Sequence, residues 1–215
     1  ATDLESVVKW INHHFPEAKI CITGGKGPIL QSIIKHKNCC MIVEFDATSR
    51  GMNHLLNNLG VNLDSYILTN VGTGTSIHFI NSKSNTRIGG TGVGGGTVIG
   101  LSLLLTGIDD YSSIVSQAKQ GNRNGIDLKV KDIYEGAEPP IFGDLTASNF
   151  GNAHFNKTST ASKEDLLASI LGLVGETVAT TSIFAAGQFG VQDIVFIGTS
   201  FYNNDFLRNV VEEYT

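Results

Sequence analysis

The first sixty residues alternate between helix-like and strand-like apolar patterns. Residues 2–5 (TDLE) form a capping box before the first helical pattern. The apolar positions of that helix fall on one face, at Leu4, Val7, Val8, Ile11 and Phe15. Apolar runs at 19–23 (KICIT) and 39–45 (CCMIVEF) predict two buried strands, and helices are predicted at 28–36 and around 52–59. This alternation is typical of an α/β layer structure.

A second group of elements follows from residue 64. The run DSYILTN predicts a strand, and the next two strands flank a glycine turn as a β-hairpin. Helices are predicted from Thr97, from Asp110 and from about Gly125, and then as one long helix over 162–187. The strand DIVFIG, the loop TSFYNN and a last helix complete the chain. The stretch 134–151 is rich in Pro and Gly and too long for a plain connection, and such loops are often functional.

Composition narrows the classes of partner. The 215 residues carry a net charge of −5 and a pI near 5.6, which argues against nucleic acid or an anionic membrane as the main partner. Three cysteines make no disulfide framework and favour a reduced, cytosolic setting. Neither they nor the six histidines show metal-ligand spacing. The apolar segment 166–186 is interrupted by Glu176 and by Thr-Thr-Ser, so no membrane-spanning helix is predicted.

Glycine and threonine crowd two short segments, residues 71–76 and 89–97. The P-loop pattern fails, because the Gly-Lys pair at Gly25 precedes another glycine. The dinucleotide fingerprint at 90–95 follows a polar strand, and the acidic residues about 20 positions further on start a helix, so it is rejected. Both segments could instead be tight turns packed against neighbouring backbone. Because one flanks a hairpin and the other a helix start, we favour phosphate binding by their amides and hydroxyls.

Four motifs together resemble a known family. They are VEFDA, NVGTGTS, RIGGTGVGGGTVIGLSLLL and PPIFGDLTASNFG, and the resemblance to type II pantothenate kinases, especially the staphylococcal form, covers essentially the whole chain. The resemblance implies the α/β, actin-like ATPase fold of acetate and sugar kinases, with a nucleotide cleft between two lobes. It further implies a cytoplasmic homodimer that phosphorylates pantothenate with ATP and Mg²⁺ in the first step of coenzyme A synthesis. The lobes would be residues 1–63 and 64–215.

The resemblance also assigns the two residues at the reaction centre. Glu44 would be the catalytic base, and its place after an apolar strand predicts partial desolvation and a raised proton affinity. Arg87 would contact substrate and stabilise charge on the transferring phosphoryl group. The alternatives are a structural carboxylate paired with a core arginine and a strand-edge arginine in a surface ion pair.

The nucleotide-binding positions come from the same resemblance. They are Gly72, Thr73, Gly74, Thr75, Gly95, Gly96, Thr97, Val98, Ile99, Tyr111 and Thr199, with Ser200 beside the last. A lone tyrosine at a helix start is more often a packing residue. The turn 71–76 is expected to face the cleft.

The sequence departs from the family at both ends. The family's opening Asp-x-Gly-Gly-Thr loop for phosphate and magnesium does not occur in this sequence, and the family continues past its last residue. We therefore expect a fragment with incomplete sheets and assign no magnesium ligand. Another small-molecule kinase of the actin-like fold, or a non-catalytic nucleotide-binding fragment, stays open. The broad apolar surface of helix 162–187 further predicts self-association, through Leu166, Leu167, Ile170, Leu171, Leu173, Val174 and Val178.

Overall fold

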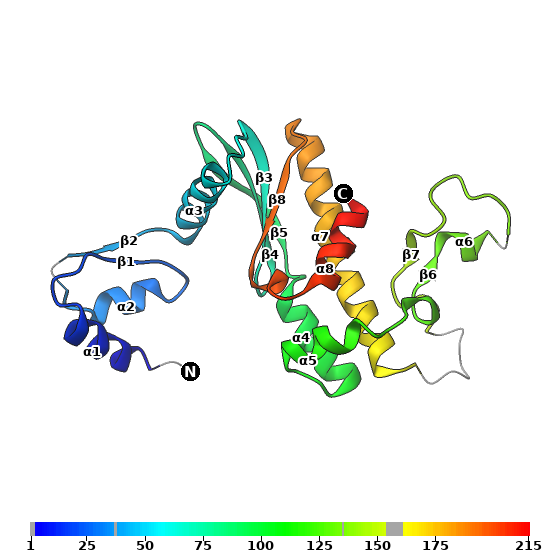
Figure 1. Cartoon of the computed structure of the whole chain (residues 1–215), viewed down its shortest axis with the longest axis horizontal. Helices are drawn as coiled ribbons and strands as arrows, with labels where there is room; N and C mark the ends of the chain where they lie inside the picture. The colour runs from blue at the N-terminus through cyan, green and yellow to red at the C-terminus, as the bar shows by residue number, and fades with distance from the viewer. Residues whose placement is uncertain (1–2, 37, 135, 154–160) are drawn as a thin grey trace. The chain divides into compact units, whose positions relative to one another are not determined.

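The computed structural model describes the chain apart from residues 1–2, 37, 135 and 154–160. The chain divides into two compact units (Figure 1). The first comprises Ala1–Asp64 and Ile80–Asn85, and the second comprises Ser65–Phe79 and Thr86–Thr215. The segment 80–85 is the tip of a hairpin whose other residues belong to the second unit, and it is part of the first. Each unit has its own hydrophobic core.

Within its described residues, the first unit is built mainly of five short elements. In chain order they are α1 (Leu4–His14), β1 (Ile20–Ile22), α2 (Gly27–Ile33), β2 (Cys39–Met41) and α3 (Glu44–Asn58). β1 and β2 pair in parallel, and Val8, Ile22 and Ile34 form the small core. The cap of α1 is Asp3, whose carboxylate accepts the amide of Glu5 over 3.1 Å, whereas Thr2 lies outside the described residues.

The predicted strand over 39–45 is too long. β2 ends at Met41, one further amide, that of Ile42, donates to the Ile22 carbonyl over 2.9 Å, and α3 begins at Glu44. Acidic side chains are favoured in the first turn of a helix, since the amides there carry partial positive charge, and Glu44 and Asp46 occupy that turn. The strands are not buried either, because β1 has a single buried residue, Ile22.

A four-stranded sheet organises the second unit. Its strands are β3 (Ser65–Val71), β4 (Thr75–Asn81), β5 (Asn85–Thr91) and β8 (Ile194–Ile197), in the order β5-β4-β3-β8. Tight turns join β3 to β4 and β4 to β5, which confirms the predicted hairpin around the first glycine turn. β8 arrives from the far end of the chain and pairs with β3 in parallel, with Ile67 opposite Ile194. The carboxyl ends of β3 and β8 therefore meet at one edge of the sheet.

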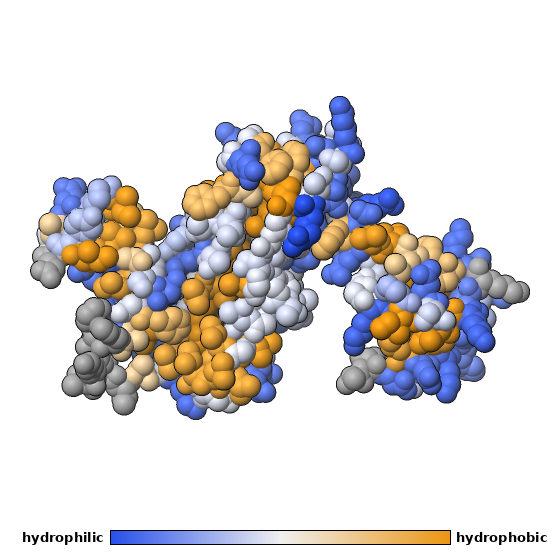
Figure 2. Space-filling model, turned by 180° about the vertical axis from the view of Figure 1, so that it is seen from behind, coloured by the Kyte–Doolittle hydropathy of each residue, from blue (hydrophilic) through white to orange (hydrophobic). Residues whose placement is uncertain are grey.

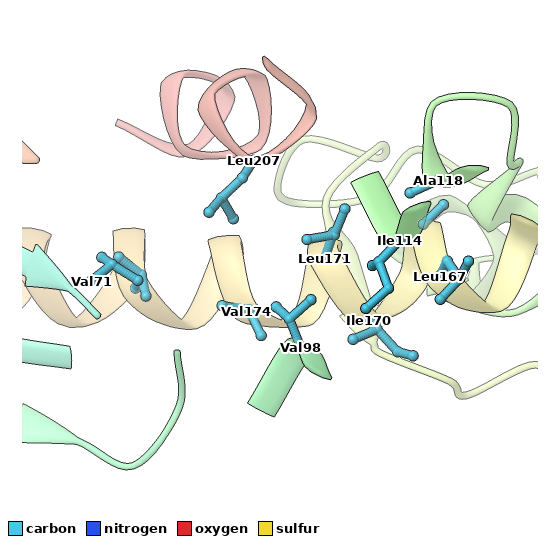
Figure 3. Packing of buried hydrophobic residues seen from close by; sticks show 11 residues of the cluster. Val71, Val98, Ile114, Ala118, Leu167, Ile170, Leu171, Val174 and Leu207 are labelled. Carbon is cyan, nitrogen blue, oxygen red and sulfur yellow. The ribbon is translucent and has the colours of Figure 1, made fainter. Parts of the chain in front are cut away.

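The long helix α7 (Lys163–Phe189) is the centre of this unit. Ser162 caps it by accepting the amide of Asp165 over 3.1 Å, and Gly190 ends it in a left-handed conformation. Around it pack β3, α4 (Gly95–Thr106), α5 (Tyr111–Ala118) and α8 (Asp205–Tyr214) (Figure 3). Their shared core consists of Val71, Val98, Ile114, Ala118, Leu167, Ala168, Ile170, Leu171, Val174, Val178 and Leu207.

This packing changes two expectations about α7. Its apolar residues span several faces because four other elements cover them within the same chain, so their breadth gives no support for a second copy. By length and apolar composition α7 also meets the requirement for crossing a membrane, despite Glu176 and the Thr-Thr-Ser break. However, 67% of its most apolar window is buried inside this unit, as expected of the core helix of a globular domain.

The region after α5 differs from the predicted helix near Gly125. It contains a short turn of 3₁₀ helix at Arg123–Gly125, then β6 (Leu128–Lys129), α6 (Val130–Ile133) and β7 (Thr146–Ser148). β6 and β7 pair antiparallel, so the Pro- and Gly-rich loop returns to the strand it left. The helix observed there, α6, has only four residues, because the chain then turns back to pair β7 with β6.

A buried ionic network attaches this region to α7. Arg123 donates to Asp127 over 2.7 Å and to Glu176 over 2.5 Å, and its side chain is only 15% exposed. Glu176 also accepts from the hydroxyl of Thr146 over 2.8 Å and from the amide of Asn149 over 2.9 Å. Glu176, the charged residue within the apolar sequence of α7, thus attaches the loop that contains β7 to this helix.

Candidate functional site

The two glycine segments pack against each other at the carboxyl end of β3. The amide of Gly95, at the start of α4, donates to the carbonyl of Gly72 over 2.8 Å, and the amide of Gly96 donates to Thr73 over 2.8 Å. A Cβ on Gly94 would lie 2.8 Å from the Cα of Gly74, closer than any side chain tolerates. Side chains are therefore excluded because one backbone approaches another.

This contact corrects part of the phosphate-binding interpretation. The first two amides of α4 are engaged within the chain, so they are not the groups that face a ligand. The hydroxyls of Thr75 and Thr97 are engaged as well, the first with Val93 over 2.8 Å and the second with Gly92 over 3.1 Å. Val98 is fully buried in the core. These residues shape the segment, and the ligand-facing groups lie beside them.

A pocket of about 280 Å³ opens next to this contact. It is lined by Gly72, Thr73, Gly95, Gly96, Ile99, Tyr111, Thr199 and Ser200. Seven of the eleven predicted nucleotide-binding residues thus surround one pocket, together with Ser200, whereas Gly74, Thr75, Thr97 and Val98 lie outside its lining. Within the part of the chain that the structure describes, the exposed hydroxyls of Thr73 and Thr199 have no hydrogen-bond partner. With the positive end of α4 nearby, these hydroxyls suit an anionic ligand.

Tyr111 is fixed in the wall of this pocket. Its hydroxyl donates to the carbonyl of Ser200 over 2.6 Å and accepts from the side-chain amide of Asn204 over 2.9 Å. Ser200 in turn donates to the carbonyl of Gly72 over 3.2 Å. Desolvation raises the pKa of Tyr111, while its two hydrogen bonds oppose that shift. Tyr111 therefore links α5 to the short 3₁₀ turn Thr199–Phe201 by hydrogen bonds, so its role is not limited to packing.

Asn204 is a site residue that the sequence reasoning missed. It is completely buried, and its side-chain oxygen caps α8 by accepting the amide of Leu207 over 3.1 Å. An asparagine before an apolar-periodic segment is a recognised helix-start signal. That signal could have located the cap, but not the contact with Tyr111, which lies 93 residues earlier in the chain.

The two predicted catalytic residues stand in different units. Glu44 is the first residue of α3 in the first unit, and it is exposed, so the argument from desolvation at a strand end is wrong. Arg87 lies on β5 in the second unit and is also exposed. Among the described residues, no ion pair involves either side chain.

Comparison with known proteins defines the class. One solved structure, the activator of the 2-hydroxyisocaproyl-CoA dehydratase from Clostridium difficile with bound ADPNP, superposes with a TM-score of 0.56 at 14% identity. The match covers 98% of this chain and 71% of that one. The protein is an α/β protein of the actin-like ATPase fold.

Sequence comparison then gives the family. The profile of the family described as Fumble matches residues 4–213. The type II pantothenate kinase of Staphylococcus saprophyticus is 46% identical over 216 residues, covering all of this chain and 80% of the relative. That of Staphylococcus aureus (strain USA300) is 45% identical over 213 residues, covering 99% and 79%. The chain belongs to the Fumble family, that of the type II pantothenate kinases.

Proposed function

We propose that this protein transfers the γ-phosphoryl group of ATP to pantothenate, giving 4′-phosphopantothenate in the first step of coenzyme A synthesis. The observation that carries the proposal is the pocket beside the paired glycine segments. The residues expected to hold ATP line this pocket. They provide backbone without side chains, two unengaged hydroxyls and a tyrosine that hydrogen bonds hold in place. The names of the two staphylococcal relatives supply the acceptor.

Glu44 and Arg87 are the proposed reaction-centre residues. The primary hydroxyl of pantothenate has a very high pKa, so a carboxylate positioned to accept its proton accelerates attack on the γ-phosphorus by about 10²–10⁴-fold. Arg87 offers a planar fork of donors for the oxygens of the transferring group, whose negative charge is spread over three atoms. Exposure of both side chains leaves them accessible to substrate.

Mg²⁺ enters this proposal only as the ion that accompanies ATP. Within the described residues, no group of three or more His, Cys, Asp or Glu side chains could hold a metal ion. Mg²⁺ in such sites is usually held by one or two carboxylates together with phosphate oxygens and water, so the proposal names no ligand for it and assigns no step to it.

We further propose that the active protein is a cytoplasmic homodimer. The apolar side chains that the fold leaves uncovered include Leu103, Leu104 and Leu105 on α4, which are 48%, 80% and 49% exposed. Figure 2 shows apolar side chains gathered at the lower edge of the central part of that view. Contiguous exposed apolar surface often marks a contact between proteins. Light scattering at micromolar concentration, with Leu104→Glu as the disrupting variant, tests this proposal.

The activity is tested by ADP formation from ATP with and without pantothenate. We expect turnover that requires pantothenate, and sugars or N-acetylhexosamines should not replace it. Glu44→Gln should lose most turnover while ATP affinity stays nearly unchanged, and Arg87→Lys should also impair turnover. Asp46→Asn is the matched control, because it removes another acidic charge from the first turn of α3. Equal losses in Glu44→Gln and Asp46→Asn would argue that helix charge, rather than proton transfer, is what matters.

A further inference from the structure

Two of the three cysteines oppose one another across β1 and β2. The parallel register places Cys21 opposite Cys40 and the neighbouring Cys39 opposite Ile20. Opposed residues in a parallel pair lie on the same face, and adjacent strands are about 4.8 Å apart. Cys21 and Cys40 are free and exposed, and Cys39 is less accessible. Cys21 and Cys40 therefore form an accessible dithiol.

The thiols share one hollow of about 290 Å³. Its lining comprises Lys19, Ile20, Cys21, Asn38, Cys39 and Cys40. Desolvation, followed by an interaction with the Cys40 thiol, raises the pKa of the Cys21 thiol. Lys19 adds a positive charge that favours an anionic thiol reagent. The hollow is large enough for part of a small peptide-like molecule.

We propose that Cys21 and Cys40 form a thiol-exchange site, which a low-molecular-weight disulfide oxidises to an intramolecular disulfide. Disulfide-bonded residues usually have Cα atoms about 4.4–6.8 Å apart, a range that includes the spacing of adjacent strands. Metal binding has less support, because two thiols do not complete a metal site and the described residues provide no third ligand of the usual kinds.

The exchange proceeds in two balanced steps. The thiolate of one cysteine attacks a sulfur of the disulfide RSSR, forms a mixed disulfide and releases RS⁻. The second cysteine, as thiolate, attacks the protein sulfur of that mixed disulfide, closes the Cys21–Cys40 bond and releases a second RS⁻. The two protein thiols lose two electrons and two protons, and the two released thiols carry them away.

Oxidation of the two cysteines should also affect the position of Glu44, the proposed base. This consequence rests on the proposed function. The pairing of β1 with β2 continues to Ile42, and α3 begins two residues later at Glu44. Closing a disulfide fixes the Cβ atoms about 3.8 Å apart and sets the dihedral angle of the bond, and any adjustment of β2 that this requires passes to the start of α3. A displacement near 1 Å at a reaction centre costs up to about 10²-fold in rate. We therefore expect a several-fold loss of turnover on oxidation, restored by dithiothreitol.

The test uses oxidised glutathione as the disulfide and the whole protein. Wild type should lose two of its three titratable thiols and yield one cross-linked peptide joining Cys21 to Cys40. Cys39→Ser is the matched control, one position along the same strand, and should form the same cross-link. Cys21→Ser and Cys40→Ser should each stop at a glutathione adduct, with thermal unfolding confirming that all three variants are folded.

Three results would overturn the proposal or part of it. Retention of three free thiols, or adducts alone in wild type, excludes the exchange site. Loss of the cross-link in Cys39→Ser with its survival in Cys40→Ser excludes the assigned pair. A cross-link that leaves turnover unchanged contradicts only the proposed effect on Glu44 and leaves the exchange site standing. If the reduced wild-type protein has no turnover, the proposed function itself is wrong.

Discussion

The side-chain amide of Asn204 donates to the hydroxyl of Tyr111 over 2.9 Å, and that hydroxyl donates to the carbonyl of Ser200 over 2.6 Å. Asn204 reaches the same carbonyl over 3.2 Å while its oxygen caps α8. One buried side chain thus sets a wall of the candidate nucleotide pocket and begins the last helix. A substitution at Asn204 should therefore change ligand binding in this pocket, although Asn204 is not one of the residues that line it.

Replacing Asn204 separates these two roles. Asn204→Asp keeps an oxygen for the cap but cannot donate to Tyr111 or Ser200, so we expect the KM for ATP to rise by about fivefold for each ~1 kcal/mol of lost positioning. Tyr111→Phe should raise it similarly, and the double variant should show coupling of about 0.5–3 kcal/mol. Additive effects in the double-mutant cycle would show that the two side chains act independently. Steady-state kinetics and urea unfolding provide the measurements.

Two glycines on one helix should respond in opposite ways to alanine. A Cβ on Gly95 would lie 2.6 Å from the hydroxyl oxygen of Ser200 and 2.9 Å from the carbonyl of Gly72, so Gly95→Ala should destabilise the fold by about 1–3 kcal/mol. Gly100, five residues along α4, has no atom within 4 Å of its Cβ position. Gly100→Ala should be neutral or stabilise by up to about 1 kcal/mol. Equal effects would mean that close backbone approach does not explain the first glycine.

The sequence predicted the second unit well where patterns were long. The helix over 162–187 and the hairpin around residues 71–76 occur as expected, because a buried 27-residue helix and a turn between two β-branched runs leave strong local signals. The first unit was predicted less well. Glu44 was placed on a strand because Ile42 and Val43 are apolar, but a three-residue strand gives too little pattern to locate its end.

The candidate site, too, was predicted only in part. The nucleotide-binding residues came from family motifs, and the structure gathers seven of them around one pocket. The engagement of the Gly95 and Gly96 amides with the preceding turn had no sequence signal, since glycine clusters are compatible with both ligand approach and backbone packing. Asn204 was missed because its partners are distant in sequence.

Arg123 should be far more important for stability than an exposed cation with a similar contact. Its side chain pairs with Asp127 and Glu176 in a largely buried setting, so Arg123→Met should cost about 3–5 kcal/mol by leaving buried carboxylates unpaired. Lys131→Met is the matched control. It breaks the 2.6 Å pair with Asp144, in which both side chains are more than half exposed, and should leave the free energy of unfolding almost unchanged. Similar losses in urea unfolding would contradict the role given to burial.

Glu176 should make stability depend on pH in the acidic range. Desolvation raises the pKa of its carboxyl, but hydrogen bonds and charge from Arg123, with further hydrogen bonds from Asn149 and Thr146, outweigh it and hold the pKa below the ordinary value of 4.5. The folded state therefore keeps this carboxylate ionised at pH values where the unfolded chain has bound a proton. Its contribution is present above the unfolded pKa and is lost as pH falls through the folded one.

Glu176→Gln tests that contribution, because glutamine carries no charge and keeps one acceptor oxygen for Arg123 and Thr146, although its amide nitrogen cannot accept from Asn149. The free energy of unfolding should be lower in the variant than in wild type by a constant amount above about pH 5, and the gap should narrow below about pH 4. Asp144→Asn serves as the comparison. The pKa of Asp144 is also lowered, by its hydrogen bond with Lys131, but the pair is exposed and salt screens it. If the gap for Glu176→Gln stays constant down to pH 3, the carboxylate does not gain its stability through ionisation, and the network would have to act through packing and neutral hydrogen bonds.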